Sequence, residues 1–211
     1  MENHLINSMQ NRYAVKKFDA GKKLTDQQLN AVLEAARLTA TSYGLQLMKI
    51  VVVDNPEIRK ELVLHSYNQQ QIADASHLLV LCRERKVDAS HVEDFIKNVA
   101  NTREQDIDKL EGYKNMMLRD MASMSEEEQV IWMDKQIYIL LGNLMTALAV
   151  LNIDSCPMEG FKPAEYDRIL GLEEQNLASV LVLPIGYRAT DDPNALRKKV
   201  RRAEDQFIVR V

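Results

Sequence analysis

The feature that most constrains the fold of this chain is a long helical pattern that is apolar on nearly every side. Ser125 and Glu128 form a capping box, S-x-x-E, which predicts that a helix begins there. We expect the helix to run past Leu144 towards Leu151, with apolar residues all round it after Ile137. Such a helix must be covered on all sides, so the pattern predicts a central helix, buried by the rest of the chain or by a second subunit.

Other signals predict helices that surround this one. Thr25 and Gln28 form a second capping box, followed by apolar residues at helical spacing. The pair Asn55-Pro56 places a helix N-cap before a proline in the first turn. Residues 88–122 are polar and rich in helix formers, which predicts a solvent-facing helical excursion.

Strand patterns are few and short. Residues 49–54, 78–82 and 179–185 are nearly continuous runs of Val, Ile and Leu, typical of strands buried on both faces. Residues 206–211 (QFIVRV) alternate as an edge strand that could pair with another subunit. Helices outweigh strands and do not alternate regularly with them, so the pattern favours an α+β fold over a Rossmann fold.

Composition bounds the class of protein. The chain has 211 residues with only seven glycines and five prolines, so we expect a single domain over residues 1–211. Its hydrophobic share of 46% and charged share of 27% are those of soluble globular proteins. A net charge of −4 argues against bulk binding of nucleic acid. The only cysteines, Cys82 and Cys156, fit a reducing compartment. With neither a signal-peptide pattern nor an uninterrupted membrane-length apolar run, the sequence predicts a cytoplasmic protein that does not bind membranes.

The usual catalytic patterns are missing from this sequence. It contains no G-x-S-x-G, no G-x-G-x-x-G after a strand and no phosphate-binding loop. Its four histidines and two cysteines have no metal-ligand spacing. An enzyme with this sequence would therefore take its reactivity from a cofactor, with no catalytic side chain and no metal.

Two basic segments and one turn call for an explanation. In an extended segment Arg12 and Lys16 point the same way, which favours an anion such as phosphate, although an ordinary solvated turn is the alternative. The basic run 197–202 fits the second half of a phosphate site, a soluble tail or, without interleaved aromatic residues, a weak nucleic-acid patch. The stretch 156–161 (CPMEGF) predicts a fixed turn with exposed N–H groups, suited to a flat ligand or simply a turn.

Taken in order, these segments resemble the FMN-dependent nitroreductase family, in its branch of oxygen-insensitive NAD(P)H nitroreductases and dihydropteridine reductases. The resemblance runs from residues 11–19 (NRYAVKKFD) through 35–46 (AARLTATSYGLQ) and 157–160 (PMEG) to 199–201. It implies a central, mostly antiparallel sheet flanked by helices. It further implies an intertwined homodimer with exchange of the C-terminal strand and FMN at the interface, and a substrate pocket near residues 88–122.

The resemblance also assigns residues to cofactor binding. These are Arg12, Tyr13, Ala14, Lys16, Ser42, Gly44, Gln46, Asn68, Gln71, Pro157, Met158, Glu159, Gly160, Lys199 and Arg201. The two basic pairs would converge on the FMN phosphate, and the loop 42–46 would reach the flavin from the other subunit. Asn68 would hydrogen-bond the flavin ring, and the turn at 159–160 would present backbone N–H groups to its N5 edge.

Several positions depart from the family pattern. Ala14 stands where a hydroxyl residue is usual, and Gln71 where a lysine is often found. The common Gln-Pro-Trp is replaced by residues 46–48 (QLM), and the pair Tyr43-Gly44 replaces a more polar version of the loop. These departures bear on the choice between NADH and NADPH and on the oxidant.

The implied activity is an NAD(P)H-dependent flavin oxidoreductase. By resemblance it would work in ping-pong fashion, passing two electrons from NADH or NADPH through flavin N5 to flat acceptors such as nitroaromatics or quinones. Three alternatives stay open at this point: the same fold reducing a pteridine, an enone or free flavin; a flavin-binding module without turnover; and, least favoured, a nucleic-acid role for residues 197–202.

Overall fold

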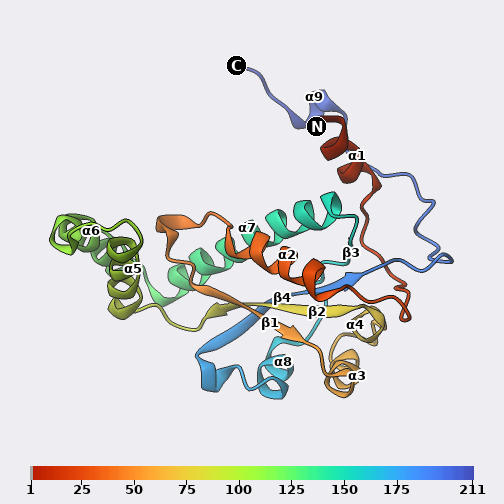
Figure 1. Ribbon diagram of the computed structural model, residues 1–211, viewed down its shortest axis with the longest axis horizontal. Helices are drawn as coiled ribbons and strands as arrows, with labels where there is room; N and C mark the ends of the chain where they lie inside the picture. The colour runs from red at the N-terminus through yellow and green to blue at the C-terminus, as the bar shows by residue number, and fades with distance from the viewer. Residues whose placement is uncertain (1) are drawn as a thin grey trace.

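Helix α7, Glu126–Val150, crosses one face of a central sheet in the computed structural model, which describes residues 2–211 (Figure 1). The predicted capping box forms as expected. The Ser125 hydroxyl accepts a hydrogen bond from the Glu128 backbone N–H, and the Glu128 carboxylate accepts one from the Ser125 N–H at 2.8 Å. Two N–H groups that a helix start would otherwise leave unpaired are thereby satisfied.

The sheet has four strands in the order β1-β2-β4-β3 within residues 2–211. Its strands are β1 Met48–Val53, β2 His77–Glu84, β3 Asp154–Ser155 and β4 Leu177–Gly186. All three pairings are antiparallel, which confirms the expected α+β class with an antiparallel sheet. The sequence pattern located β1, β2 and β4, but β3 is two residues long and carries no periodicity that a sequence could show.

Alternate residues of the two middle strands face two separate cores, as the pleat of a strand requires. Towards α7 and α2 (Asp26–Arg37), the sheet presents Leu79 and Leu81 of β2 with Leu181 and Leu183 of β4. All four side chains are buried. Figure 1 shows α2 and α7 together on this side of the sheet.

The opposite face of the sheet forms the second core. Leu78 and Val80 of β2 and Val182 of β4 are fully buried there, against α3 (Pro56–Leu64) and α8 (Pro163–Ile169). The prediction that the strands are buried on both faces is confirmed for β2 and β4, but it is wrong for β1, an edge strand whose residues are mostly half-buried. Shorter helical turns complete the connections: η1 Ser42–Gly44, α4 Gln71–Asp74 and η3 Glu173–Gln175.

The helical excursion projects from the sheet at the left of Figure 1. It consists of α5 (Ala89–Thr102), η2 (Ile107–Leu110) and α6 (Glu111–Ala122). Its exposed polar surface agrees with the prediction, but the excursion also has a small core of its own. That core is built from Val92, Ile96, Met117 and Met121.

The two ends of the chain lie away from the sheet. Helix α1 spans Glu2–Asn11, and the short helix α9 spans Glu204–Phe207. The predicted strand at 206–211 is therefore wrong for its first two residues, which are helical, and residues 208–211 pair with no strand of the described chain. A strand needs a partner edge, and this segment extends away from the sheet of its own chain (Figure 1). Within residues 2–211, no helix combines the length and hydropathy that a membrane crossing needs.

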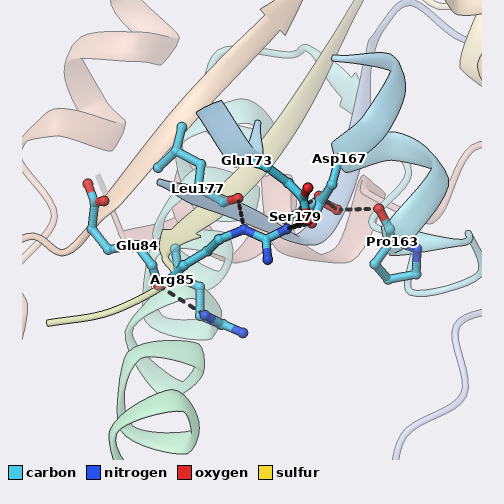
Figure 2. Close-up of polar contacts among 8 residues, drawn as sticks. Glu84, Arg85, Pro163, Asp167, Glu173, Leu177 and Ser179 are labelled. Atoms are coloured by element: carbon cyan, nitrogen blue, oxygen red, sulfur yellow. Dashed lines mark hydrogen bonds and ion pairs between the residues drawn. The ribbon is translucent and has the colours of Figure 1, made fainter. Parts of the chain in front are cut away.

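A buried polar cluster fastens α8 to the sheet (Figure 2). The Asp167 carboxylate accepts hydrogen bonds from the Ser179 N–H at 2.9 Å and from its hydroxyl at 2.6 Å. Its second oxygen receives the Arg85 guanidinium at 3.1 Å, and Arg85 also donates to the Leu177 carbonyl. Arg85 reaches the exposed Glu173 as well, at 2.7 Å. Because Asp167 is buried, its charge depends on these donors for compensation.

Replacing Ser179 by alanine removes one of these donors and leaves the carboxylate short of a partner. We expect Ser179→Ala to lower the free energy of unfolding by about 1–3 kcal/mol. Glu173→Ala is the matched control, because Glu173 holds the same arginine from an exposed position, where an ion pair contributes little. Urea denaturation of both variants measures the difference, and equal losses would contradict the importance of the buried donor.

Candidate functional site

Six basic side chains from opposite ends of the chain line one cleft, Arg197 and Lys198 among them. Arg12 and Lys16 follow α1, while Lys199 and Arg201 come from the C-terminal segment, and the cleft between them has a volume of about 520 Å³. The Lys199 ammonium donates to the Arg12 carbonyl, which joins the two segments directly. The structure thus brings together the two basic pairs that the sequence analysis assigned to one anion.

The charges of Arg12, Lys199 and Arg201 repel one another, and no carboxylate within residues 2–211 forms an ion pair with them. Burial, and then the charge of Arg201, lower the pKa of Arg12. Burial, followed by the charges of Arg12 and Arg201, likewise lowers the pKa of Lys199. The Arg12 Nε is buried without a hydrogen-bond partner among residues 2–211. Clustered cations with an unpaired donor are the arrangement that binds a polyanion such as a phosphate group.

One buried carboxylate holds the walls of this cleft together. Asp192, 4% exposed, accepts the Tyr13 hydroxyl at 3.1 Å and the backbone N–H groups of Lys16 and Lys17 at 3.1 and 3.3 Å. Its other oxygen accepts the Asn194 N–H at 2.9 Å. Burial by itself would raise the pKa of Asp192, but the backbone donors and the tyrosine outweigh it and lower that pKa.

Tyr13 is fixed on both sides. Its hydroxyl bonds Asp192, and the Arg188 guanidinium lies over its ring, 4.5 Å from the ring centre. Burial and the bond to Asp192 raise the pKa of Tyr13 to about 12. The phenol therefore stays protonated and acts as a hydrogen-bond donor that orders the segment around Ala14. Ala14 itself forms an isolated β-bridge with Ser155 of β3 and offers no polar side chain to a ligand.

Two turns meet next to this segment. The Lys16 ammonium lies 3.6 Å from the buried Cys156 Sγ, and the Gln71 amide nitrogen lies 3.9 Å from the same sulfur. Burial raises the pKa of the Cys156 thiol, and the charge of Lys16 opposes that shift. On the far side of the turn, the Gln69 side chain donates to the Gly160 carbonyl at 3.0 Å. Lys16, the 68–71 turn and the 156–160 turn therefore form one continuous wall.

The 156–160 turn presents free backbone donors. Met158 is buried and exchanges hydrogen bonds with Val182 of β4, which anchors the turn after Pro157. Among residues 2–211, the N–H groups of Glu159 and Gly160 have no backbone acceptor. The Glu159 carboxylate instead receives the Tyr138 hydroxyl at 2.6 Å. A side chain at Gly160 would lie 3.1 Å from Gln69, so the turn is closely packed.

Asn68 lies at the rim of the same wall. It and Tyr67 both have left-handed backbone conformations, with φ of 58° and 52°. Consecutive left-handed residues without glycine store strain, and such strain is concentrated at binding sites.

The predicted flavin loop lies elsewhere in its own chain. The Ser42 N–H donates to Gln136, on the first half of α7, whereas Arg12 borders a hollow shared with Ala149 near the end of that helix. That separation corresponds to about 20 Å along an α-helix. Figure 1 shows the loop between α2 and β1 beside α5, far from α1. Gln46 lines a separate hollow against β1. Ser42, Gly44 and Gln46 therefore do not join the basic cleft of this chain.

Comparison with known proteins identifies the family of this chain. The sequence model described as the nitroreductase family matches residues 9–187. The chain belongs to the nitroreductase family. It is 32% identical over 216 residues to a Staphylococcus saprophyticus protein with the provisional name of an NAD(P)H nitroreductase, covering 99% of this chain and 97% of that one.

Solved structures show the same fold. A nitroreductase-like protein of Streptococcus mutans superposes with a TM-score of 0.85 at 21% identity, over 100% of both chains. An Exiguobacterium sibiricum protein solved in complex with FMN gives a TM-score of 0.83 at 16% identity, over 98% of this chain and 97% of that one. The expected family and fold are confirmed, and the expected oxidoreductase class, FMN and NAD(P)H agree with these names.

Sequence reasoning missed several residues that shape this nitroreductase site. Asp192 was not singled out because an isolated Asp-Asp-Pro stretch reads as a surface turn. Gln69 and Arg188 act through contacts with distant segments and carry no local pattern. No group of three or more His, Cys, Asp or Glu residues within 2–211 is arranged to hold a metal ion.

The Asp192 clamp predicts a pH-dependent stability. Because the folded-state pKa is lowered, the ionised carboxylate stabilises the fold above a pH of about 4, and this contribution is lost as the pH falls through the folded-state value. We expect Asp192→Asn to cost about 1–3 kcal/mol at pH 7, with the difference from the natural protein shrinking below about pH 4. Chemical denaturation across that pH range tests this.

The neighbouring residue gives a matched control. Asp191 pairs with Lys17 in solvent, so Asp191→Asn should leave stability nearly unchanged. An Asp192→Asn variant as stable as Asp191→Asn at pH 7 would contradict the clamp.

Proposed function

We propose that this nitroreductase-family protein is an FMN-dependent NAD(P)H oxidoreductase that passes two electrons to flat acceptors such as nitroaromatics or quinones. The observation that carries the proposal is a cleft lined by clustered cations, one of which, Lys16, also contacts Cys156 at the start of the turn that presents the free N–H groups of residues 159–160. The name of the Staphylococcus saprophyticus relative and the FMN complex of the structural neighbour support the same cofactors.

The residues present fit FMN. A phosphate in the cleft would neutralise Arg12, Lys199 and Arg201 and would give the buried Arg12 Nε the acceptor it lacks. The Lys16 ammonium, whose side-chain partner is a neutral thiol, would meet the ring where negative charge gathers on reduction. Bound FMN supplies the chemistry, accepting a hydride from NAD(P)H and passing two electrons on.

The two turns would hold the ring. The N–H groups of Glu159 and Gly160 would donate to the N5 edge, and the absence of a side chain at Gly160 allows the backbone to approach it closely. Asn68 and Gln71 would face the ring from the opposite turn, Gln71 as a neutral amide where the family often has a lysine. Pro157 and Met158 would fix the turn against β4.

We further propose a cytoplasmic homodimer in which each copy completes the site of the other. Within residues 2–211, the outer edge of β1 pairs with no strand, and a hollow of about 310 Å³ lies beside it. Exposed apolar residues on α1 and α7 provide a face for a second copy: Leu5, Ile6, Met9, Ile131 and Ile139. Residues 208–211 would then pair with a partner's sheet, and loop 42–46 would reach a partner's FMN. Both cysteines are free, as in a reducing compartment.

The direct test of function is an anaerobic absorbance titration. We expect the purified protein to show the bands of oxidised flavin, to lose them with NADH or NADPH and to regain them with a quinone. A protein that is colourless and does not take up added FMN would overturn the proposal. Flavin that binds but does not bleach would overturn turnover and favour a binding module. Running an enone and a pteridine beside the quinone identifies the acceptor class.

The basic cleft makes a sharper prediction. Arg201→Ala should weaken FMN binding about tenfold or more, because it removes one charge-assisted contact to the phosphate. Arg202→Ala is the control, since the adjacent Arg202 does not line the cleft. Fluorescence titration of the apoprotein gives both dissociation constants. Equal affinities in the two variants would show that the phosphate binds elsewhere.

The C-terminal segment makes a prediction about assembly. Deleting residues 208–211 should shift the dimer towards monomer at micromolar concentration, because it removes the proposed strand from the partner's sheet. Sedimentation velocity measures this, with an Arg210→Ala variant of the full chain as the control. A truncated protein that stays as tightly dimeric as the control would contradict strand exchange.

A further inference from the structure

The loop between α2 and β1 has an unusual backbone for its composition. Tyr43, Gly44 and Gln46 have φ of 57°, 80° and 49°, all in the left-handed region. Glycine adopts such angles freely, but tyrosine and glutamine do so only when surrounding contacts compensate the strain. The conformation of this loop therefore depends on the side chains that contact it.

Tyr43 is the main point of attachment to the helical excursion. Its hydroxyl donates to the Asp120 carboxylate of α6 at 2.5 Å, and its carbonyl accepts the Tyr113 hydroxyl at 3.3 Å. Its ring packs at 6.5 Å, centre to centre, from both Tyr113 of α6 and Trp132 of α7. Two helices thus hold one strained residue by its hydroxyl, its ring and its backbone.

The neighbours of Tyr43 are held by the same group of helices. The Ser42 N–H donates to the Gln136 side chain of α7 at 2.8 Å. A side chain at Gly44 would lie 3.2 Å from the Phe95 ring of α5, so the backbone is in close contact there. The loop and the excursion are therefore a single packed unit, in which Tyr43 carries the hydrogen bond to a charged group.

We propose that Tyr43 is a positioning residue that couples the α5–α6 excursion to the loop 42–46 and so sets the presentation of Ser42 and Gly44 to the flavin of a second copy. This inference rests on the proposed function. Loss of the Tyr43–Asp120 bond releases the strained backbone of the loop.

The experiment compares Tyr43→Phe with Tyr187→Phe in the full-length dimer. Both changes remove one hydroxyl that donates to a side chain, but Tyr187 bonds Gln28 of α2, away from the loop. We expect Tyr43→Phe to raise the dissociation constant for FMN fivefold or more and to change the visible circular dichroism of bound FMN. Tyr187→Phe should leave both within twofold of the natural protein.

Hydrogen exchange of the apoprotein gives a readout that needs no flavin. In Tyr43→Phe, residues 41–46 and 111–122 should exchange faster together, while the exchange of β2 and β4 stays unchanged. Asp120→Asn weakens the same bond from the other side and replaces Tyr43→Phe if that variant fails to fold. The double variant should be no worse than the more affected single variant, because both remove one interaction.

The outcomes separate the two proposals. If the natural protein binds no FMN, the proposed function fails, and the exchange of the loop and α6 still tests the coupling. If it binds FMN and Tyr43→Phe alters neither flavin affinity nor the joint exchange, the positioning role of Tyr43 is overturned and the function stands. A loss of thermal stability alone, matched by Tyr187→Phe, also overturns it.

Discussion

The antiparallel ladder of β2 and β4 is the constraint on which the rest of this structure depends. Both strands are buried on both faces, so their backbones satisfy each other and their alternating side chains define two separate cores. One face is covered by α2 and α7, the other by α3 and α8. Because the two cores share these strands, the turn at 156–160 and the segment after α1 are positioned by one rigid sheet.

The candidate site lies where the segment after α1 meets the segment before α9. Neither end supplies a core of its own, and both carry positive charge that would separate them. The buried carboxylate of Asp192 overcomes this by accepting hydrogen bonds from residues on both sides of the cleft. One anion therefore organises the backbone of a site whose remaining cations stay available for a ligand. A protein with a net charge of −4 can therefore hold a cleft lined by clustered cations.

The chain also leaves apolar surface of α7 exposed. Helix α7 buries part of its apolar surface against its own sheet and leaves Ile131, Tyr138 and Ile139 exposed. The loop 42–46 contacts Gln136 in the first half of that helix, and Arg12 of the basic cleft borders a hollow shared with Ala149 in its last turn. In the homodimer that we propose, the loop of one copy would reach the cleft of the other, and the distance between loop and cleft in a single copy agrees with that proposal.

The sequence by itself determined most of the local elements and indicated which residues to propose for the site. Capping boxes at Thr25 and Ser125 and continuous apolar runs identified α2, α7 and three strands, because these signals act over a few residues. Motif resemblance identified the basic pairs and the turn at 159–160. Only the tertiary structure decided that Asp192 joins the basic segments, that β3 exists and that residues 206–207 are helical. These depend on contacts between residues far apart in the chain, and no local pattern records them.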